Sequence, residues 1–354
     1  MATGYWSASR IDCANYCRMK YYLKYVERYT PLRLSAYAKG SLLHELIENF
    51  WGRLGTEEEA GKRSSTKKYF DAETFAKYAQ GKWTSIIISS KNSKNPINWN
   101  YEDERWFIKS DLKNICIPLY SNLVEQGPPI FSELSFDFSL FGKRFKGRVD
   151  EIRLSEEGKV IIRDFKSGRP WIGDMKLNYD TQLTFYNAAV CSVCYADEEF
   201  AKKLGIGEER KKFMGNPYFV NPDFRQEFFM IEALKTNDSS KRSKSAPTLI
   251  YSTNRKDEHF LELLTMINGT QKAISSGNVY PERGRKCDSC DMKHVCEKKL
   301  DEVNRGFAED KKGQILLDFA TPIYARKIET KEESPPQEQL KMKLRKKRSA
   351  KNHK

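Results

Sequence analysis

The sequence predicts an α/β fold in which helices flank a central sheet. Three consecutive segments between residues 131 and 167 have the alternating or apolar patterns of strands. Longer segments on either side of them, "AYAKGSLLHELIENFWGRLG" and "DTQLTFYNAAVCSVCYA", have the apolar spacing of helices. The chain of 354 residues is 39% hydrophobic and 12% aromatic, which is enough to build a large core.

Two helices are expected before the sheet. The first, over residues 7–30, has Ser7 or Ser9 as its N-cap and continues through the aromatic and apolar "YYLKYV". The second, over residues 36–55, has one apolar stripe, formed by Leu43, Ile47, Phe50 and Leu54. Residues 55–125 predict a charged helical insertion, interrupted by the loop "KNSKNPINWN".

The strands follow in direct succession. "SELSFDFSLF" alternates apolar and polar residues, "FGKRFKGRVDEIRL" follows a Phe-Gly turn signal, and "GKVIIRDFKS" supplies a third strand. This succession predicts an antiparallel meander, on which the helix "DTQLTFYNAAVCSVCYA" packs. Further strands in "QEFFMIEAL" and "TLIYST" flank the loop "TNDSSKRSKSAP", and a last helix around "HFLELLTMINGTQKAISSG" leads to a cysteine-rich segment.

The net charge of +14 suggests a polyanionic partner, and this charge is unevenly distributed. The last 14 residues, "KMKLRKKRSAKNHK", hold eight Lys or Arg and no acidic residue, so more than half of the excess lies there. We expect a single domain over residues 1–325 and a disordered basic tail over residues 326–354. The tail would bind nucleic acid non-specifically or serve as a nuclear address.

The chain has no apolar run of the roughly 18 residues that a membrane span needs. Its start, "MATGYWSASRIDCANYC", lacks the basic and then apolar layout of a signal peptide. We therefore expect a cytoplasmic protein without membrane contact, or a nuclear one if the host is eukaryotic. Structural disulfides are rare in these compartments, so the eight cysteines are interpreted as core thiols or metal ligands.

Asp164 and Lys166 end the third predicted strand. Residues i and i+2 of a strand share a face, so these side chains project together while Phe165 turns into the core. In isolation such a pair is most often a solvated ion pair. Here Asp150 closes "GRVD" on the second strand, and strand pairing would bring the two carboxylates to one end of the sheet. Clustered carboxylates suit Mg²⁺ or Mn²⁺, and such a metal beside a lysine can cleave a phosphodiester.

"GRVDEI" and "DFK", with thirteen residues between their aspartates, resemble the signature of the PD-(D/E)XK nuclease superfamily, and most closely its RecB-like group. The resemblance implies a restriction-endonuclease-like core, with a central mixed sheet flanked by helices. It also implies catalytic roles for Asp150, Asp164 and Lys166, with the two aspartates binding Mg²⁺ or Mn²⁺.

Three further segments resemble motifs of the same group. "GSLLHELIE" resembles its first motif, which implies that His44 helps to bind the metal. "QLTFY" resembles its Gln-x-x-x-Tyr motif, which implies that Gln182 and Tyr186 contact the DNA strand or orient Lys166. "SELSF" resembles the strand with an acidic residue before the central hairpin, which makes Glu133 a further candidate. Each segment alone has an ordinary structural interpretation, and their order along the chain favours the nuclease.

"CDSCDMKHVC" places Cys287, Cys290 and Cys296 in a C-x2-C-x5-C pattern, which supplies three soft ligands. A zinc site or a cubane cluster needs a fourth ligand, and His294 within the same loop would complete a zinc site. The remaining cysteines, Cys116, Cys191 and Cys194, are expected to be core thiols.

The better fourth ligand comes from the other end of the chain. "SASRIDCANYCRMKYYLKYV" resembles the N-terminal segment of the iron–sulfur branch of RecB-like nucleases, with Arg18 where a Pro usually follows the cysteine. This implies Cys17 as a ligand of a [4Fe–4S] cluster, with Cys13 in reserve. Such a cluster would join the N- and C-terminal segments, as in the AddB C-terminal nuclease domain and the CRISPR adaptation nucleases.

We therefore expect a metal-dependent nuclease that acts on single-stranded DNA from an end, in repair, recombination or replication. Aromatic N-terminal helices and basic loops suit stacking and backbone contacts along a single strand. The sequence has no Walker A motif, so the protein would work alone or join a helicase or a CRISPR integration complex. The alternatives are a CRISPR adaptation nuclease that processes spacer ends, an RNA-directed nuclease, and a non-catalytic nucleic-acid-binding or assembly protein with the same fold.

Overall fold

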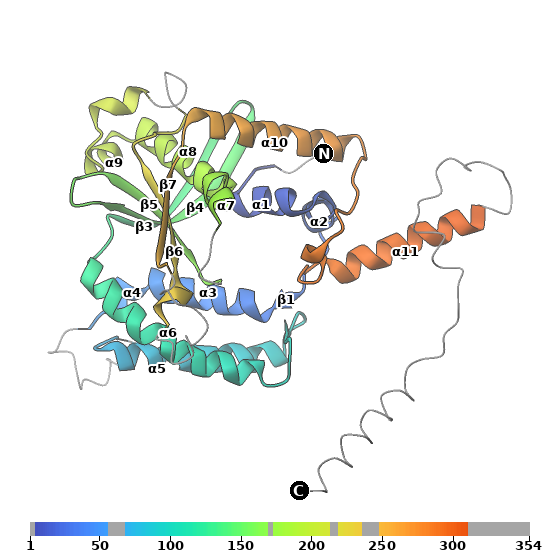
Figure 1. Ribbon diagram of the computed structural model, residues 1–354, viewed down its shortest axis with the longest axis horizontal. Coiled ribbons are helices and arrows are strands. Elements are labelled where there is room, and N and C mark those ends of the chain that lie inside the picture. The colour runs from blue at the N-terminus through green and yellow to red at the C-terminus, as the bar shows by residue number, and fades with distance from the viewer. Residues whose placement is uncertain (1–3, 56–67, 169–172, 213–218, 236–247, 311–354) are drawn as a thin grey trace, which may run out of the picture. The chain divides into compact units, whose positions relative to one another are not determined.

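The computed structural model describes residues 4–55, 68–168, 173–212, 219–235 and 248–310 (Figure 1). The chain divides into two compact units, Met1–Lys298 and Lys299–Lys354. The sheet and all candidate site residues belong to the first unit, and the described part of the second unit is the end of helix α11 (Lys293–Asp310). The predicted basic tail lies outside the described residues, so the division into one domain and a tail stays a prediction.

A mixed sheet of five strands forms the centre of the first unit, in the order β3-β4-β5-β6-β7. The strands are β3 (Phe131–Leu140), β4 (Lys143–Leu154), β5 (Val160–Lys166), β6 (Arg225–Met230) and β7 (Ile250–Asn254). β3, β4 and β5 form the predicted antiparallel meander. β6 pairs with β5 in parallel and with β7 in antiparallel orientation, so the chain must cross over between β5 and β6.

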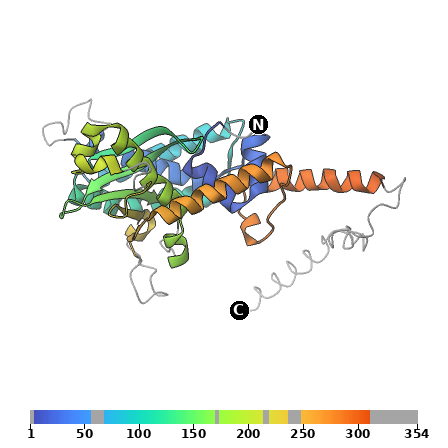
Figure 2. The same cartoon turned by 90° about the horizontal axis from the view of Figure 1, so that it is seen from above.

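Helices cover both faces of this sheet (Figures 1 and 2). On one face lie α1 (Ala8–Tyr16), α8 (Thr181–Ala196), α9 (Glu198–Lys203) and α10 (Asp257–Ser275). On the other lie α3 (Ser35–Glu48), α4 (Phe50–Arg53), α5 (Ala72–Lys91) and α6 (Glu104–Gln126). Strand alternation explains the two cores, because Phe145 and Val149 of β4 pack toward the first face while Phe165 of β5 packs toward the second.

Shorter elements complete the fold. They are α2 (Arg18–Tyr21), a π-helical turn (Tyr22–Val26), β1 (Arg33–Leu34), β2 (Ile97–Asn98), α7 (Asp174–Asn178) and the 3-10 helices Glu208–Lys212, Ile231–Leu234 and Arg285–Cys287. β1 and β2 pair in parallel, so part of the segment predicted as a loop is strand. None of the described helices is long and apolar enough to cross a membrane.

The helix predicted over residues 7–30 is interrupted at Cys17. α1 ends at Tyr16, Cys17 has an extended backbone with φ −169° and ψ 123°, and α2 begins at Arg18. The amide of Cys17 still donates to the carbonyl of Cys13 at 3.0 Å, so the chain resumes a helix after a single extended residue. No Gly or Pro lies at this break, so the sequence pattern predicted one continuous helix across it.

The predicted insertion contains two long helices, α5 and α6, which pack against α3 through buried apolar side chains. α5 begins with a capping box, in which the Asp71 carboxylate accepts from the amide of Thr74 and the Thr74 hydroxyl accepts from the amide of Asp71. Residues 56–67 of the insertion, and the Ser- and Lys-rich loop at 236–247, lie outside the described residues. The packing of α5 and α6 supports α3 from behind, on the side away from α1 (Figure 1).

Candidate active site

Strands β3, β4 and β5 bring Glu133, Asp150 and Asp164 close together at the point where the hydrogen-bonded β4–β5 ladder ends. The β4–β5 ladder runs from Leu154 opposite Val160 to Glu151 opposite Arg163, so Asp150 and Asp164 come directly after its last pair. The strands separate there, and a carboxylate oxygen of Asp150 accepts a hydrogen bond from the amide of Phe165 at 2.9 Å.

Glu133 reaches the same point from β3. Ser132 pairs with Glu151 and Leu134 pairs with Val149, so Glu133 lies opposite Asp150 between these two pairs. Its φ of +54° is in the left-handed region, which a residue with a side chain adopts only when its surroundings impose it. This local deviation from the ladder accompanies the approach of Glu133 to Asp150.

His44, Glu133 and Asp150 form a compact set of potential metal ligands. Among the residues that the structure describes, they are the one group of three or more His, Cys, Asp or Glu whose ligand atoms all lie within 4.8 Å of one another. His44 Nδ1 is 3.4 Å from Asp150 Oδ2. His44 comes from α3, one turn before the end of that helix, so strands and a helix of different parts of the chain meet here.

Burial shifts the pKa values of all three groups toward their neutral forms. It lowers the pKa of His44, although the charge of Asp164 acts in the opposite direction. It raises the pKa of Glu133, and together with repulsion from Asp164 it raises the pKa of Asp150 well above the ordinary value. A neutral imidazole is a metal ligand, and a cation among these carboxylates would offset both the burial and the repulsion.

Asp164 lies beside this set but is held by other partners. Its side chain is almost fully buried, Lys166 Nζ lies 2.8 Å from Oδ2, and Gln182 Nε2 donates to Oδ1 at 2.7 Å. The sequence indicated that Asp164 and Lys166 share a face, and their contact agrees with this. The compact ligand set, however, contains Glu133 rather than Asp164.

Gln182 joins these charged groups into one hydrogen-bonded chain. Its Oε1 accepts from Lys166 Nζ at 2.6 Å, and its Nε2 also donates to the hydroxyl of Tyr186 at 2.9 Å. Burial would lower the pKa of Lys166, but the charge and hydrogen bond of Asp164 outweigh it and raise the pKa on balance. Lys166 is therefore a fixed cation. Burial raises the pKa of Tyr186 well above the ordinary value, so its hydroxyl stays neutral.

The start of α8 fixes the position of Gln182 through two residues, Asp180 and Arg255, that were not predicted from the sequence. Asp180 caps this helix, and its carboxylate accepts from the amides of Gln182 at 2.9 Å and Leu183 at 3.1 Å. Arg255, which is fully buried, donates to the carbonyl of Asp180 at 3.3 Å and to the hydroxyl of Thr184 at 2.9 Å. The Asp before "TQL" was a readable capping signal, whereas no pattern in the sequence pointed to Arg255.

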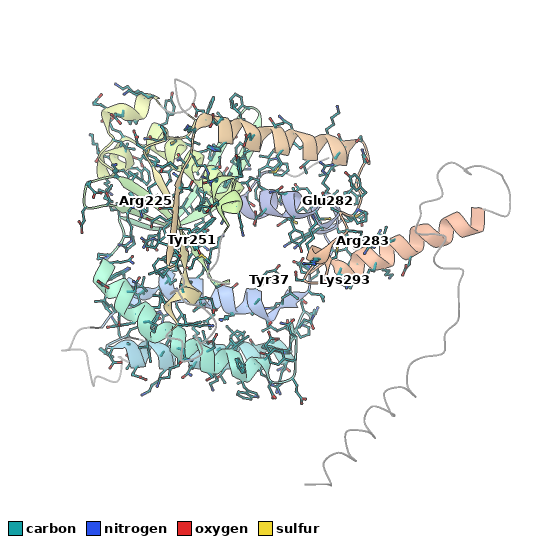
Figure 3. The ribbon with its side chains drawn as sticks, in the orientation of Figure 1. Tyr37, Arg225, Tyr251, Glu282, Arg283 and Lys293 are labelled. Atoms are coloured by element: carbon teal, nitrogen blue, oxygen red, sulfur yellow. The ribbon has the colours of Figure 1, made fainter. Side chains whose placement is uncertain are left out.

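The ligand set opens onto a cavity of about 650 Å³ between α1, α3 and the sheet. Ser7 and Asp12 of the N-terminal segment, Tyr37, Glu48 and His44 of α3, and Arg148 of β4 are among its lining residues. Tyr37, labelled in Figure 3, is half-exposed on this wall. Gln182 and Tyr186 also line the cavity, so the hydrogen-bonded chain of Lys166 reaches its surface.

The cysteines predicted as cluster ligands surround a second, small cavity of about 30 Å³. Cys17, Cys287, Cys290 and Cys296 all line it. The break between α1 and α2 lies at Cys17 itself, Cys287 and Cys290 come from the segment that leads into α11, and Cys296 lies in the first turn of α11. Cys13 does not line this cavity, and burial raises its pKa to about 12.

The other cysteines and His294 are placed differently. Cys116, Cys191 and Cys194 are fully buried in the two apolar cores, as expected of core thiols. His294 is not among the lining residues of the cysteine cavity. The structure thus brings together the four cysteines that the resemblance implied, without the reserve ligand or the local histidine.

Contacts between protein groups hold the cysteine segment against the N-terminal helices. Lys20 Nζ lies 2.7 Å from Oδ1 of the buried Asp291, whose carbonyl accepts from the amide of Leu32 at 2.9 Å. The Tyr16 hydroxyl donates to the carbonyl of Lys286, and the Lys286 ammonium donates to the carbonyl of Tyr16. Figure 3 labels Glu282, Arg283 and Lys293 in this segment, all three of which line the cysteine cavity.

Comparison with known proteins gives one family. A model of the PD-(D/E)XK nuclease superfamily matches residues 5–297. A solved structure from Eubacterium rectale, titled "Putative exonuclease", is 14% identical, with 92% of this chain and 93% of that chain covered and a TM-score of 0.35. The solved structure of SSO0001 is 13% identical, with 73% and 96% covered and a TM-score of 0.25. No curated protein matches the chain. Both TM-scores are low, so the assignment to a family rests on the family match alone.

Proposed function

The chain belongs to the PD-(D/E)XK nuclease superfamily, and from this premise we propose that it is a Mg²⁺- or Mn²⁺-dependent deoxyribonuclease that degrades single-stranded DNA from an end. One observation carries the proposal. The compact set of His44, Glu133 and Asp150 lies next to the hydrogen-bonded chain of Asp164, Lys166 and Gln182, at the wall of a cavity of about 650 Å³. The family match spans all of these residues.

His44, Glu133 and Asp150 would hold the metal. Two carboxylates and a neutral imidazole are ligands that suit Mn²⁺ and Mg²⁺, and a divalent ion would offset the burial and the repulsion that raise the pKa values of the two carboxyl groups. Asp164 would act beside them. Its negative charge favours a cation in this set, and the bond from Gln182 keeps its carboxylate in place.

A bound metal would supply Lewis acidity and lower the pKa of water at the site. The remaining work falls to the chain's own residues. Lys166, which is held as a cation by Asp164 and Gln182, would bind a phosphate oxygen or the attacking water and stabilise negative charge that develops in the transition state. Phe165 would anchor the strand beneath, since it is buried and its ring centroid lies 5.3 Å from that of Phe229.

The cavity supports a single-stranded substrate. Its lining combines the half-exposed ring of Tyr37 with hydroxyl groups of Ser7, Ser9 and Ser41. Aromatic rings stack with unpaired bases, and hydroxyl groups donate to phosphate oxygens. A duplex would offer no unstacked base to Tyr37. The chain has no Walker A motif, so strand separation would come from a helicase partner or from the state of the substrate.

We further propose that Cys17, Cys287, Cys290 and Cys296 hold a [4Fe–4S] cluster that joins the N- and C-terminal segments. Zinc is the competing occupant. Cysteine sulfurs around a tetrahedral zinc lie about 3.8 Å apart, because each Zn–S bond is about 2.3 Å long. No three sulfurs of the described cysteines lie within 4.8 Å of one another. A cubane has four iron atoms between its ligands and therefore accepts wider spacing than a single zinc ion, and the iron and zinc contents of anaerobically purified protein separate the two occupants.

The test is degradation of end-labelled single-stranded DNA by anaerobically purified protein, with Mg²⁺ or with EDTA. Asp150→Asn is the informative variant, because its amide oxygen can still accept from the amide of Phe165 while the charge is lost. Asp137→Asn, an exposed carboxylate on β3, is the control. We expect Mg²⁺-dependent cleavage that Asp150→Asn abolishes and Asp137→Asn keeps. Intact DNA in every arm, with DNA binding preserved, would favour the non-catalytic alternative.

A further inference from the structure

Arg148 forms an ion pair with Glu133, one of the three proposed metal ligands. It lies on β4 two residues before Asp150, so both side chains are on the same face of the sheet. Its Nε forms an ion pair with Glu133 Oε2, and its Nη1 is 3.5 Å from Oε1 of Glu48 at the end of α3. The side chain is 53% exposed and lines the large cavity.

Glu133 would therefore have two cations competing for it. The guanidinium of Arg148 lies against this carboxylate and offsets its negative charge while no metal is bound. A divalent ion held by Glu133, Asp150 and His44 would occupy the same carboxylate and would repel a guanidinium beside it. The two cations would repel each other across one carboxylate, so a bound metal would weaken the hold of Glu133 on Arg148.

We propose that Arg148 binds a phosphate of the nucleic acid strand after the metal has displaced it from Glu133. The inference rests on the proposed function. Glu133 thus binds the guanidinium of Arg148 while the metal site is empty. When the metal site is occupied, this guanidinium becomes available to bind a phosphate in the cavity. Metal and nucleic acid would then strengthen each other's binding, because such coupling is reciprocal.

The chemistry of Arg148 favours a phosphate over the other available partner. Glu48 is exposed and 3.5 Å away, which makes it a weak partner. A guanidinium binds two phosphate oxygens in parallel, and such bidentate pairs are among the stronger interactions near a protein surface. Arg148 reaches the cavity without burying its charge, so its move costs little desolvation.

The chain contains a matched control on the same two strands. Arg144 of β4 pairs with Asp137 of β3 through Nε at 2.8 Å and Nη2 at 2.6 Å. Its side chain is 56% exposed, close to the value for Arg148, but neither Arg144 nor Asp137 lines the cavity. Arg144→Ala therefore removes an equivalent cross-strand ion pair away from the site.

The first measurement is Mn²⁺ binding by calorimetry without DNA. We expect Arg148→Ala to bind Mn²⁺ about three- to tenfold more tightly than wild type, because a competing cation is gone, and Arg144→Ala to stay within about twofold. Equal or weaker Mn²⁺ affinity in Arg148→Ala would overturn the inference. If wild type binds no Mn²⁺, the proposed function fails and this inference fails with it. If wild type binds Mn²⁺ and Arg148→Ala binds it no more tightly, only this inference fails.

The second measurement is the affinity for single-stranded DNA by fluorescence anisotropy, with Ca²⁺ or with EDTA, on DNA checked to be intact afterwards. We expect Ca²⁺ to strengthen DNA binding by wild type and Arg144→Ala. In Arg148→Ala the strengthening should be at least about threefold smaller, and Arg148→Lys should fall between them because an ammonium cannot bind bidentately. The same strengthening in all four proteins would refute the role of Arg148 as a phosphate-binding residue.

Discussion

Gln182 is expected to act as a positioning residue for Lys166, and Gln182→Ala tests this. The substitution removes the bond from Lys166 at 2.6 Å and the bond to Asp164 at 2.7 Å. Two bonds to charged groups are lost, but the direct contact between Lys166 and Asp164 at 2.8 Å survives. The effect on the position of the ammonium is therefore counted as the one bond that Gln182 makes to Lys166. Such a bond contributes about 2–3 kcal/mol, which corresponds to a rate about 30- to 160-fold slower.

The assay is the single-turnover rate constant for cleavage of end-labelled single-stranded DNA in Mg²⁺. Tyr186→Phe is the matched control, since it removes only the neutral bond between Gln182 and Tyr186 and should slow the rate by about fivefold. Mn²⁺ affinity should be unchanged in Gln182→Ala, because Gln182 is outside the compact ligand set. A rate within about threefold of wild type, at an unchanged melting temperature, would refute the reasoning.

Three further outcomes are expected. Burial would raise the pKa of Asp111, but its bonds to two lysines lower it on balance below 3.8, so its stabilising contribution is present above that value and is lost as the pH falls through the lowered pKa. Urea midpoints between about pH 6 and pH 3 should therefore fall more steeply for wild type than for Asp111→Asn. Glu227→Gln should cost about 1.5–3 kcal/mol of unfolding free energy in urea titrations, because Arg163 loses one of its two buried carboxylate partners and keeps Glu151; a loss below about 0.5 kcal/mol would contradict this. Cys17→Ser should lower the iron content of anaerobically purified protein by at least about half while Cys13→Ser keeps it, and the reverse result would make Cys13 the ligand.

The central sheet and the groups on it followed from local rules. Alternation along β3 and the order of strand, turn and strand predicted the meander. The spacing of Asp164 and Lys166 predicted a shared face, and Phe165 indeed turns into the opposite core. These outcomes depend on the geometry of single strands and their nearest neighbours, which a sequence encodes directly.

The details that define the site were less accessible. The left-handed backbone of Glu133, the extended Cys17 and the turn of Asp164 toward Gln182 all depend on contacts between segments distant in the chain. The cross-strand pair of Arg148 and Glu133 likewise has no signal in either segment alone. Local propensity cannot report such features, because the competing conformations differ only in their tertiary contacts.

The reciprocal link between Tyr16 and Lys286 joins residues 270 positions apart, and this has a consequence for biosynthesis. A ribosome that adds 5–20 residues per second needs roughly 15 to 55 seconds to make the later partner after the earlier one. During that interval α1 and α2 have left the ribosome, but the cysteine segment that closes over Cys17 does not yet exist. Assembly of the cysteine cavity is thus among the last events in the making of the protein. Nascent chains would carry Cys17 exposed to oxidants and to stray metals, and the proposed cluster would have all four of its ligands only after the cysteine segment has been made.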